Sequence, residues 1–147
     1  MKKIVLIYIC SLFSVVFAIA DNEMVTSDTS QLPSASQQFI TKYFADTEIA
    51  HIVIEKNFFR ITGYEVFLTN GVDIEFDNSG TWTEVDGNHN EIPKALIPEE
   101  ISNYINRNYA LNKISAIERE SHGFQIKLNN GIELIFDRNG HFKRIDD

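Results

Sequence analysis

The chain has 147 residues, with 13 Lys and Arg against 21 Asp and Glu, and therefore a formal net charge of −8 at pH 7. An acidic chain of this kind is a poor candidate for binding nucleic acid or an anionic lipid surface, because both require clustered basic residues. Its single cysteine, Cys10, lies near the N-terminus, so the sequence beyond it offers neither a disulfide nor a thiol nucleophile.

Residues 1–20 have the pattern of a signal peptide. Lys2 and Lys3 precede an apolar run that ends in the small-residue pattern Ala18-Ile19-Ala20. A retained membrane anchor is the alternative, but the run is shorter than the roughly 20 residues that a spanning helix prefers. We expect cleavage and a periplasmic or secreted protein. Residues 21–31 are polar and rich in Ser, Thr and Asp, which predicts a flexible leader.

The rest of the chain contains an internal duplication, because residues 64–86 align without a gap to residues 124–146. Identical residues recur 60 positions apart, namely Leu68, Asn70, Gly71, Phe76, Asp77, Gly80 and Asp86 with Leu128, Asn130, Gly131, Phe136, Asp137, Gly140 and Asp146. The duplication predicts two repeats, residues 32–86 and 95–147, joined by a linker at residues 87–94.

Each repeat is expected to begin with a helix, because apolar residues recur at helical spacing in residues 32–44 and 97–109. Alternating apolar and polar residues then predict antiparallel strands, with Gly71 and Gly80 closing three-residue hairpin loops. We therefore predict an α+β fold with two tandem repeats, each one helix packed on a four-stranded antiparallel meander sheet. Val85 has the wrong parity for the core unless its strand contains a bulge, and the corresponding Ile145 raises the same question.

The predicted register places Glu65 opposite Glu75 and Phe67 opposite Asp73 on the outer face of the first sheet. Like charges directly opposite each other destabilise a sheet by some tenths of a kcal/mol. We interpret these four residues as an acidic patch with an aromatic anchor that binds a basic partner surface. The alternative is an ordinary solvated face.

A second candidate contact is the insertion at residues 56–60, which carries Phe58 and Phe59. Two adjacent phenylalanines cannot both face the core in a regular strand. An exposed aromatic ring beside Lys56 and Arg60 would suit a partner contact. The alternative is a longer hairpin that folds one ring back over the sheet edge.

The sequence predicts no catalytic residue, metal site or cofactor, and we expect that the protein is not an enzyme. No motif for a serine nucleophile occurs. The four histidines, His51, His89, His122 and His141, lack the spacing of metal ligands. Residues 86–90 have the oxygen spacing that begins a calcium loop, but the sharp-turn glycine and the bidentate glutamate are missing.

Several motifs occur twice: an Ile-Pro or Leu-Pro before the helix, a strand that ends in Asn-Gly, an FDxxG turn, and an aromatic residue followed by a terminal Ile-Asp or Val-Asp. Over about residues 32–146 this pattern resembles the PepSY-like, beta-lactamase-inhibitor-like family of small secreted bacterial proteins. The resemblance implies paired helix-plus-sheet halves in the periplasm. The family name implies protein inhibition, although no inhibitory residue can be assigned to a position here.

From these observations we expect a periplasmic, non-catalytic protein-binding or inhibitor-like module that acts through its exposed sheet face and loops. The expected partner is another envelope protein, with no nucleic acid and no membrane insertion after signal cleavage. The alternative is a small-ligand carrier with a pocket between the repeats, which would require an enclosed apolar cavity. Whether the two sheets join into one stays open, as does the oligomeric state.

Overall fold

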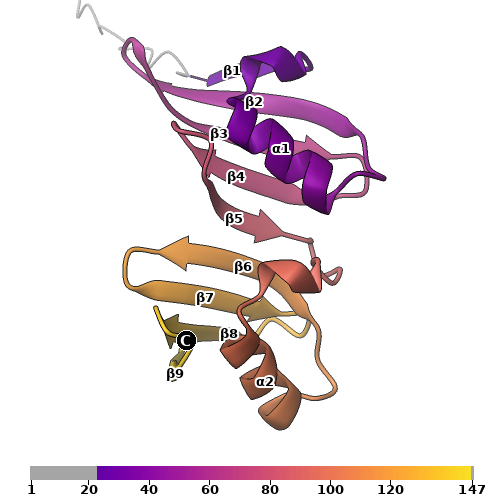
Figure 1. The fold of residues 1–147 in the computed structure, drawn as a ribbon, viewed down its shortest axis with the longest axis vertical. Helices are drawn as coiled ribbons and strands as arrows, with labels where there is room; N and C mark the ends of the chain where they lie inside the picture. Colours follow the sequence, from indigo (N-terminus) through magenta and orange to yellow (C-terminus); the bar gives the residue numbers. More distant parts are fainter. Residues whose placement is uncertain (1–22, 147) are drawn as a thin grey trace, which may run out of the picture.

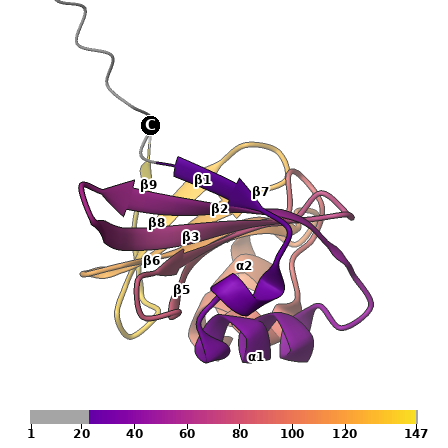
Figure 2. The ribbon, with the colours of Figure 1, turned by 90° about the horizontal axis from the view of Figure 1, so that it is seen from above.

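The computed structural model describes residues 23–146, so the expected signal peptide lies outside it. The described residues form one antiparallel sheet of nine strands in chain order, and both α-helices lie on the same face of this sheet (Figures 1 and 2). The strands are β1 Glu23–Thr26, β2 Ile49–Asn57, β3 Arg60–Leu68, β4 Asp73–Asp77, β5 Trp82–Asp86, β6 Ile114–Glu120, β7 Gly123–Leu128, β8 Glu133–Asp137 and β9 Phe142–Asp146. The helices are α1 Ser34–Tyr43 and α2 Glu99–Asn108, preceded by the short 3-10 helices η1 Thr29–Gln31 and η2 Lys94–Leu96.

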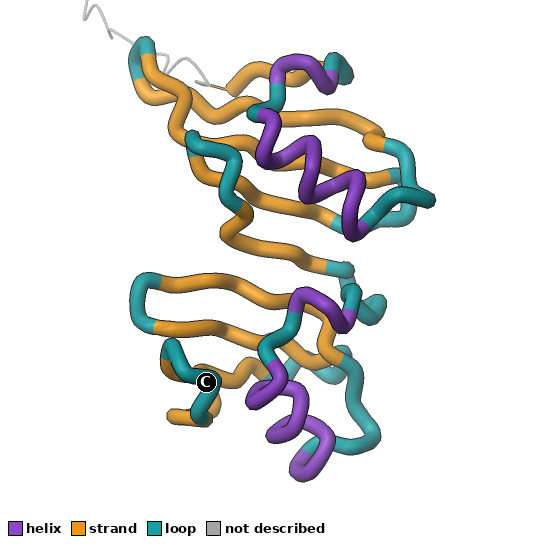
Figure 3. Tube along the Cα trace, in the orientation of Figure 1, coloured by secondary structure: helices purple, strands orange, loops and turns teal. Residues whose placement is uncertain are grey.

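The prediction of two tandem repeats, each one helix packed on a four-stranded meander sheet, is wrong, although the α+β class is confirmed. β5 and β6 pair with each other and join all the strands into a single sheet (Figure 3). The junction consists of three register pairs, Glu84–Glu118, Val85–Ile117 and Asp86–Ala116. In two separate meanders β5 and β6 would each be an exposed edge strand, which tends to pair with another strand. Their pairing buries the central residues of the junction completely.

The segment that the composition predicts to be a flexible leader contains β1, the first strand of the sheet. β1 pairs with β2 over four residues, from Glu23 opposite Glu55 to Thr26 opposite Ile52. η1 follows directly, and the Asp28 side chain accepts a hydrogen bond from the Ser30 amide at 3.0 Å. The polar composition misled the prediction because an edge strand can gain its order from backbone hydrogen bonds while its side chains stay in water.

Both helices pack their apolar side chains onto the same face of the sheet. Phe39 of α1 contacts Phe76 edge to face with ring centroids 5.6 Å apart, and Tyr104 of α2 contacts Phe136 in the same way at 5.4 Å. The N-terminus of α1 also lies on the β4–β5 turn, where the Ser36 hydroxyl donates to the Gly80 carbonyl at 3.3 Å. Among residues 23–146 no helix lies on the opposite face of the sheet, and we call this face the open face (Figure 2).

The predicted hairpin turns are confirmed. Gly71 and Gly80 both adopt the left-handed conformation, with φ of 84° and 86°. Val85 and Ile145 have the wrong parity for the core in a regular strand, and bulges in β5 and β9 account for this. Phe76 pairs with Trp82 while Glu75 pairs with Glu84, so β5 has one extra residue at this point, and β9 has the same shift. The bulge in β5 turns Val85 into the core.

Candidate functional site

Four glutamates line up side by side across the open face, one on each of four adjacent strands. Glu65 of β3 lies opposite Glu75 of β4, Glu75 lies opposite Glu84 of β5, and Glu84 lies opposite Glu118 of β6. Directly paired residues on one face have Cβ atoms about 4.5–5.5 Å apart. We call these four residues the glutamate row. It concentrates like charge along a line of about 14 Å across the strands.

The row is bounded by uncharged residues on both sides. The next position on β2 is Val53, and the next positions on β7 and β8 are Gln125 and Ile135. The acidic charge of this line is therefore confined to the four middle strands. The open face as a whole is not uniformly acidic, because Lys127 and Arg144 lie on β7 and β9.

Partial burial raises the pKa of every glutamate in the row, and repulsion from nearby carboxylates adds to it, from within the row at Glu65, Glu75 and Glu84 and from Glu120 and Glu133 at Glu118. The effect is largest at Glu84, whose pKa is raised to about 7, first by burial and then by the charges of Glu75 and Glu118. Loss of hydration also raises the pKa of Glu65, ahead of the repulsion from Glu75. A carboxyl with a raised pKa binds a proton more tightly than it would in water, and a nearby cation would reverse this effect.

The structure brings together the four patch residues that the sequence predicted. Glu65 is paired with Glu75, and Phe67 is paired with Asp73, as expected. The ring of Phe67 stacks on His51 at 4.3 Å between centroids with an interplanar angle of 10°. This stacking holds the aromatic side chain beside the acidic residues.

Sequence reasoning missed Glu84 and Glu118, which complete the row. The parity conflict at Val85 was the available signal for Glu84, because the bulge that buries Val85 also turns Glu84 to the open face beside Glu75. For Glu118 no local signal exists. Its place in the row depends on the pairing of β5 with β6.

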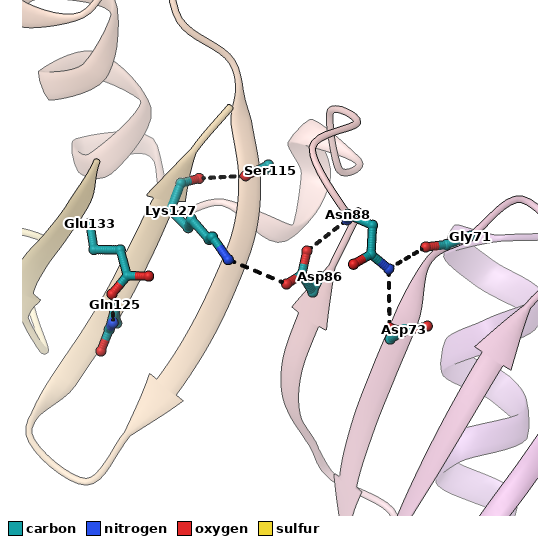
Figure 4. Close-up of polar contacts among 8 residues, drawn as sticks. All are labelled: Gly71, Asp73, Asp86, Asn88, Ser115, Gln125, Lys127 and Glu133. Carbon is teal, nitrogen blue, oxygen red and sulfur yellow. Dashed lines mark hydrogen bonds and ion pairs between the residues drawn. The ribbon is translucent and has the colours of Figure 1, made fainter. Parts of the chain in front are cut away.

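A shallow hollow of about 150 Å³ lies on the open face over the β5–β6 junction. The small side chain of Ala116 lies between β5 and β7, and above it the Lys127 ammonium reaches Asp86 at 3.9 Å (Figure 4). Beside this ion pair the Gln125 amide donates to Glu133 at 2.7 Å. The hollow is smaller than the roughly 300–1,000 Å³ of ordinary small-ligand pockets. The charge of Lys127 offsets part of the acidic charge beside the row, since it lowers the pKa of Glu84 against the larger raising effects.

A larger hollow of about 440 Å³ lies between the end of α1 and the segment that leads into η2. It is open to solvent, and polar residues such as Asp46, Asn70 and Glu91 contribute to its lining together with apolar ones. The carrier alternative requires an enclosed apolar cavity, and this hollow does not have that form.

Phe58 and Phe59 form the turn between β2 and β3 and do not join the glutamate row. Their side chains are 86% and 102% exposed, so neither ring folds back over the sheet. Phe59 lies six positions before Glu65 along the chain, a distance of about 20 Å in an extended strand. The two predicted contact regions are therefore two separate surfaces.

Within residues 23–146 no group of three or more His, Cys, Asp or Glu side chains is placed to hold a metal ion. Among the histidines, His51 packs on Phe67, and His141 lies 3.3 Å from Asp137. No helix in this part of the chain is long and apolar enough to cross a membrane.

Residues 62–144 match the model of the family described as "Putative beta-lactamase-inhibitor-like, PepSY-like". The chain belongs to this PepSY-like family. The family relationship inferred from the repeated turn motifs is thereby confirmed. The matched region contains the whole glutamate row, whereas Phe58 and Phe59 precede it.

Solved structures of similar proteins come from Bacteroides. A periplasmic protein of unknown function from Bacteroides vulgatus is 39% identical with a TM-score of 0.80, and the match covers 85% of this chain and 99% of that one. A protein from Bacteroides thetaiotaomicron, described as a "putative calcium-regulated periplasmic protein", is 38% identical with a TM-score of 0.80, over 87% and 99% of the two chains. A second B. vulgatus periplasmic protein is 37% identical with a TM-score of 0.78, over 87% and 99%.

No protein with a curated function matches this PepSY-like chain. Its similar structures are described as periplasmic proteins, in keeping with the location expected from the sequence. Neither the family description nor these structures indicate a catalytic activity.

Proposed function

We propose that this PepSY-like protein is a periplasmic, non-catalytic binding module whose open sheet face binds a basic surface of another envelope protein. The observation that supports this proposal is the glutamate row. Four carboxylates stand opposite one another across four neighbouring strands, and partial burial together with repulsion from nearby carboxylates raises the pKa of each. The inhibitor-like family description fits a protein that acts by surface complementarity.

The row lowers the stability of the free protein. Each like-charged pair across two strands destabilises a sheet by some tenths of a kcal/mol, and the row contains three such pairs. Neutral or alternating charges would be more stable at the same positions. Residues that lower the stability of the folded protein and do not belong to its core are typical of a binding surface.

A basic partner would convert this unfavourable charge into a favourable interaction. Lysine or arginine side chains laid over the row would relieve its repulsion and lower the pKa of Glu84 and its neighbours. Complementary charge also accelerates association and excludes acidic partners. Phe67, stacked on His51 beside the row, supplies an apolar contact of the kind that anchors protein interfaces.

The proposal predicts that reversing two charges in the row abolishes binding while the fold survives. Glu65 and Glu75 lie on the open face, where a lysine side chain can extend into solvent, so Glu65→Lys with Glu75→Lys should fold normally. We expect at least a tenfold loss of affinity for the captured partner, because a cationic row would repel a basic surface. Affinity capture from a periplasmic extract, identification by mass spectrometry and titration of the recovered protein measure the effect.

The matched control is Asp46→Lys with Glu48→Lys, which makes the same change in net charge at two exposed positions of the α1–β2 loop, away from the row. This variant should retain the affinity of the original protein, apart from a small effect of net charge that added salt removes. If the Glu65 and Glu75 variant still captures the partner with unchanged affinity, the glutamate row is not the binding surface.

A further inference from the structure

The hairpin of β2 and β3 projects beyond its neighbours and ends in the two exposed phenylalanines. β3 pairs with β4 only as far as Gly63 opposite Asp77, whereas β2 and β3 continue together to Asn57 opposite Arg60 (Figures 1 and 3). We call residues 56–61 the hairpin tip. Both aromatic rings of the tip therefore stand free in solvent at the end of a protruding ribbon.

The hairpin tip differs in charge from the rest of the molecule. It contains Lys56 and Arg60 and no carboxylate, in a chain with a formal net charge of −8. The nearest acidic residues are Glu55 at its base and Glu23 opposite it. Ile61 of the tip is also among the exposed large hydrophobics, and Met24 of β1 contacts Lys56 with its sulfur at 3.8 Å.

The backbone of the hairpin tip is strained at Phe58. Phe58 has φ of 54°, in the left-handed region that glycine and asparagine occupy easily and bulky side chains rarely adopt. A phenylalanine at this position lowers the stability of the turn, and its fully exposed ring gains no packing in return. Backbone strain of this kind is typical of residues at functional sites, such as a contact with a partner.

The chain enters the fold beside the hairpin tip. β1 begins at Glu23, which lies opposite Glu55, only three residues before Phe58. The sequence that precedes β1 contains the apolar run Ile4 to Ile19. Until the expected signal cleavage, this apolar run is joined to the fold at the end that carries the two exposed phenylalanines together with Lys56 and Arg60.

We propose that the hairpin tip is a peripheral contact with a phospholipid bilayer, in which Phe58 and Phe59 enter the interfacial layer and Lys56 and Arg60 bind lipid phosphates. Aromatic rings favour the membrane–water interface, and long cationic side chains extend from apolar surroundings toward the headgroups. The net charge of −8 argues against contact between a broad surface of the protein and anionic lipids. The acidic surface is repelled by such lipids, which limits the contact to the tip and keeps it reversible. The sequence predicts no membrane insertion after signal cleavage, and this contact requires no spanning segment.

This inference does not depend on the proposed function. The glutamate row lies about 20 Å from the rings along β3, so a protein partner could occupy the open face while the tip touches a bilayer. The two proposals concern different residues and are tested by different measurements.

The test uses residues 21–147, the chain expected after signal cleavage, which contain every residue of the hydrophobic core. Flotation with vesicles of phosphatidylethanolamine containing one quarter phosphatidylglycerol should recover the unmodified protein with the lipid. The double variant Phe58→Asn with Phe59→Ser should partition at least tenfold more weakly. Its melting temperature should be unchanged or higher, because asparagine suits the left-handed position of Phe58.

Leu111 provides a matched control for the loss of exposed apolar surface. It is 98% exposed in the loop between α2 and β6, at the opposite end of the strands from the hairpin tip. Leu111→Ser should therefore bind vesicles as well as the unmodified protein does. Lys56→Gln with Arg60→Gln should weaken binding to the phosphatidylglycerol vesicles and not to vesicles of phosphatidylcholine alone.

Two results would overturn the inference. The first is that the unmodified protein fails to float with the vesicles, or floats no better than the folded Phe58 and Phe59 variant. The second is that the hairpin tip captures a protein from a periplasmic extract while vesicle binding is absent, which would assign the two rings to a protein interface.

Discussion

Replacing Ile117 by alanine is expected to destabilise the protein by about 2–5 kcal/mol, because the truncation leaves a cavity in the core. Ile117 is completely buried and pairs with the equally buried Val85 at the centre of the β5–β6 junction. This junction has only three register pairs, so the loss falls on the contact that makes the nine strands one sheet. Urea unfolding followed by circular dichroism measures the change in the free energy of unfolding.

The chain contains its own control for this prediction. Ile145 belongs to the same line of residues across the sheet, which runs from Ile117 through Ile126 and Leu134. Ile145 is 47% exposed, because β9 is the last strand and no further strand covers it. Ile145→Ala should therefore destabilise the protein by less than about 1 kcal/mol. Equal losses in the two variants would mean that the β5–β6 junction is not part of the core.

The same experiment tests whether the sheet unfolds as one unit. The single tryptophan, Trp82, lies on β5 and its ring contacts Arg119 of β6, so its fluorescence reports β5 and its contact across the junction. Circular dichroism reports all the strands. A continuous sheet with a shared core should give coincident transitions by both probes. Separate transitions would indicate that β1–β5 and β6–β9 unfold independently.

Replacing Glu84 by glutamine is expected to stabilise the protein by about 1–2 kcal/mol at pH 8 and to have little effect at pH 4. The pKa of Glu84 is raised from 4.5 to about 7 by burial and by the charges of Glu75 and Glu118. At pH 4 the carboxyl is largely protonated in both the folded and the unfolded protein. As the pH rises from 4.5 to 7, the unfolded chain releases the proton while the folded protein retains it, so stability falls.

Above pH 7 the whole loss is present, and glutamine removes it because it cannot ionise. A pKa difference of this size corresponds to at most about 3.4 kcal/mol at 1.36 kcal/mol per unit. Solvent screening at this half-exposed site reduces the expected effect to about 1–2 kcal/mol. Denaturant unfolding of both proteins at pH 4 and pH 8 provides the measurement.

Glu48→Gln is the matched control, because Glu48 is an exposed carboxylate in the α1–β2 loop, outside the glutamate row. It should change the stability by no more than about 0.5 kcal/mol at either pH. An equal gain for Glu84→Gln at pH 4 and pH 8 would show that ionisation of Glu84 is not the cause.

The local sequence by itself determined the hairpins and the first part of the candidate site. Gly71 and Gly80 allow the left-handed backbone that a three-residue loop needs, and the loop then sets which residues face each other. The pairing of Glu65 with Glu75 follows from that loop alone, as does the pairing of Phe67 with Asp73. Short antiparallel hairpins can be predicted in this way because turn geometry and side-chain alternation act within a few residues of each other.

Only the tertiary structure decided that all the strands share one sheet and that the acidic patch extends into a row. β5 and β6 are separated by the linker and α2, and β1 is a short exposed segment that pairs with the edge of β2. The exposure of Phe58 and Phe59 was decided by the length of the β2–β3 turn. Pairing between distant strands depends on which strand edges remain free after the local hairpins have formed. The alternation of residues within one strand does not indicate which other strand it will pair with.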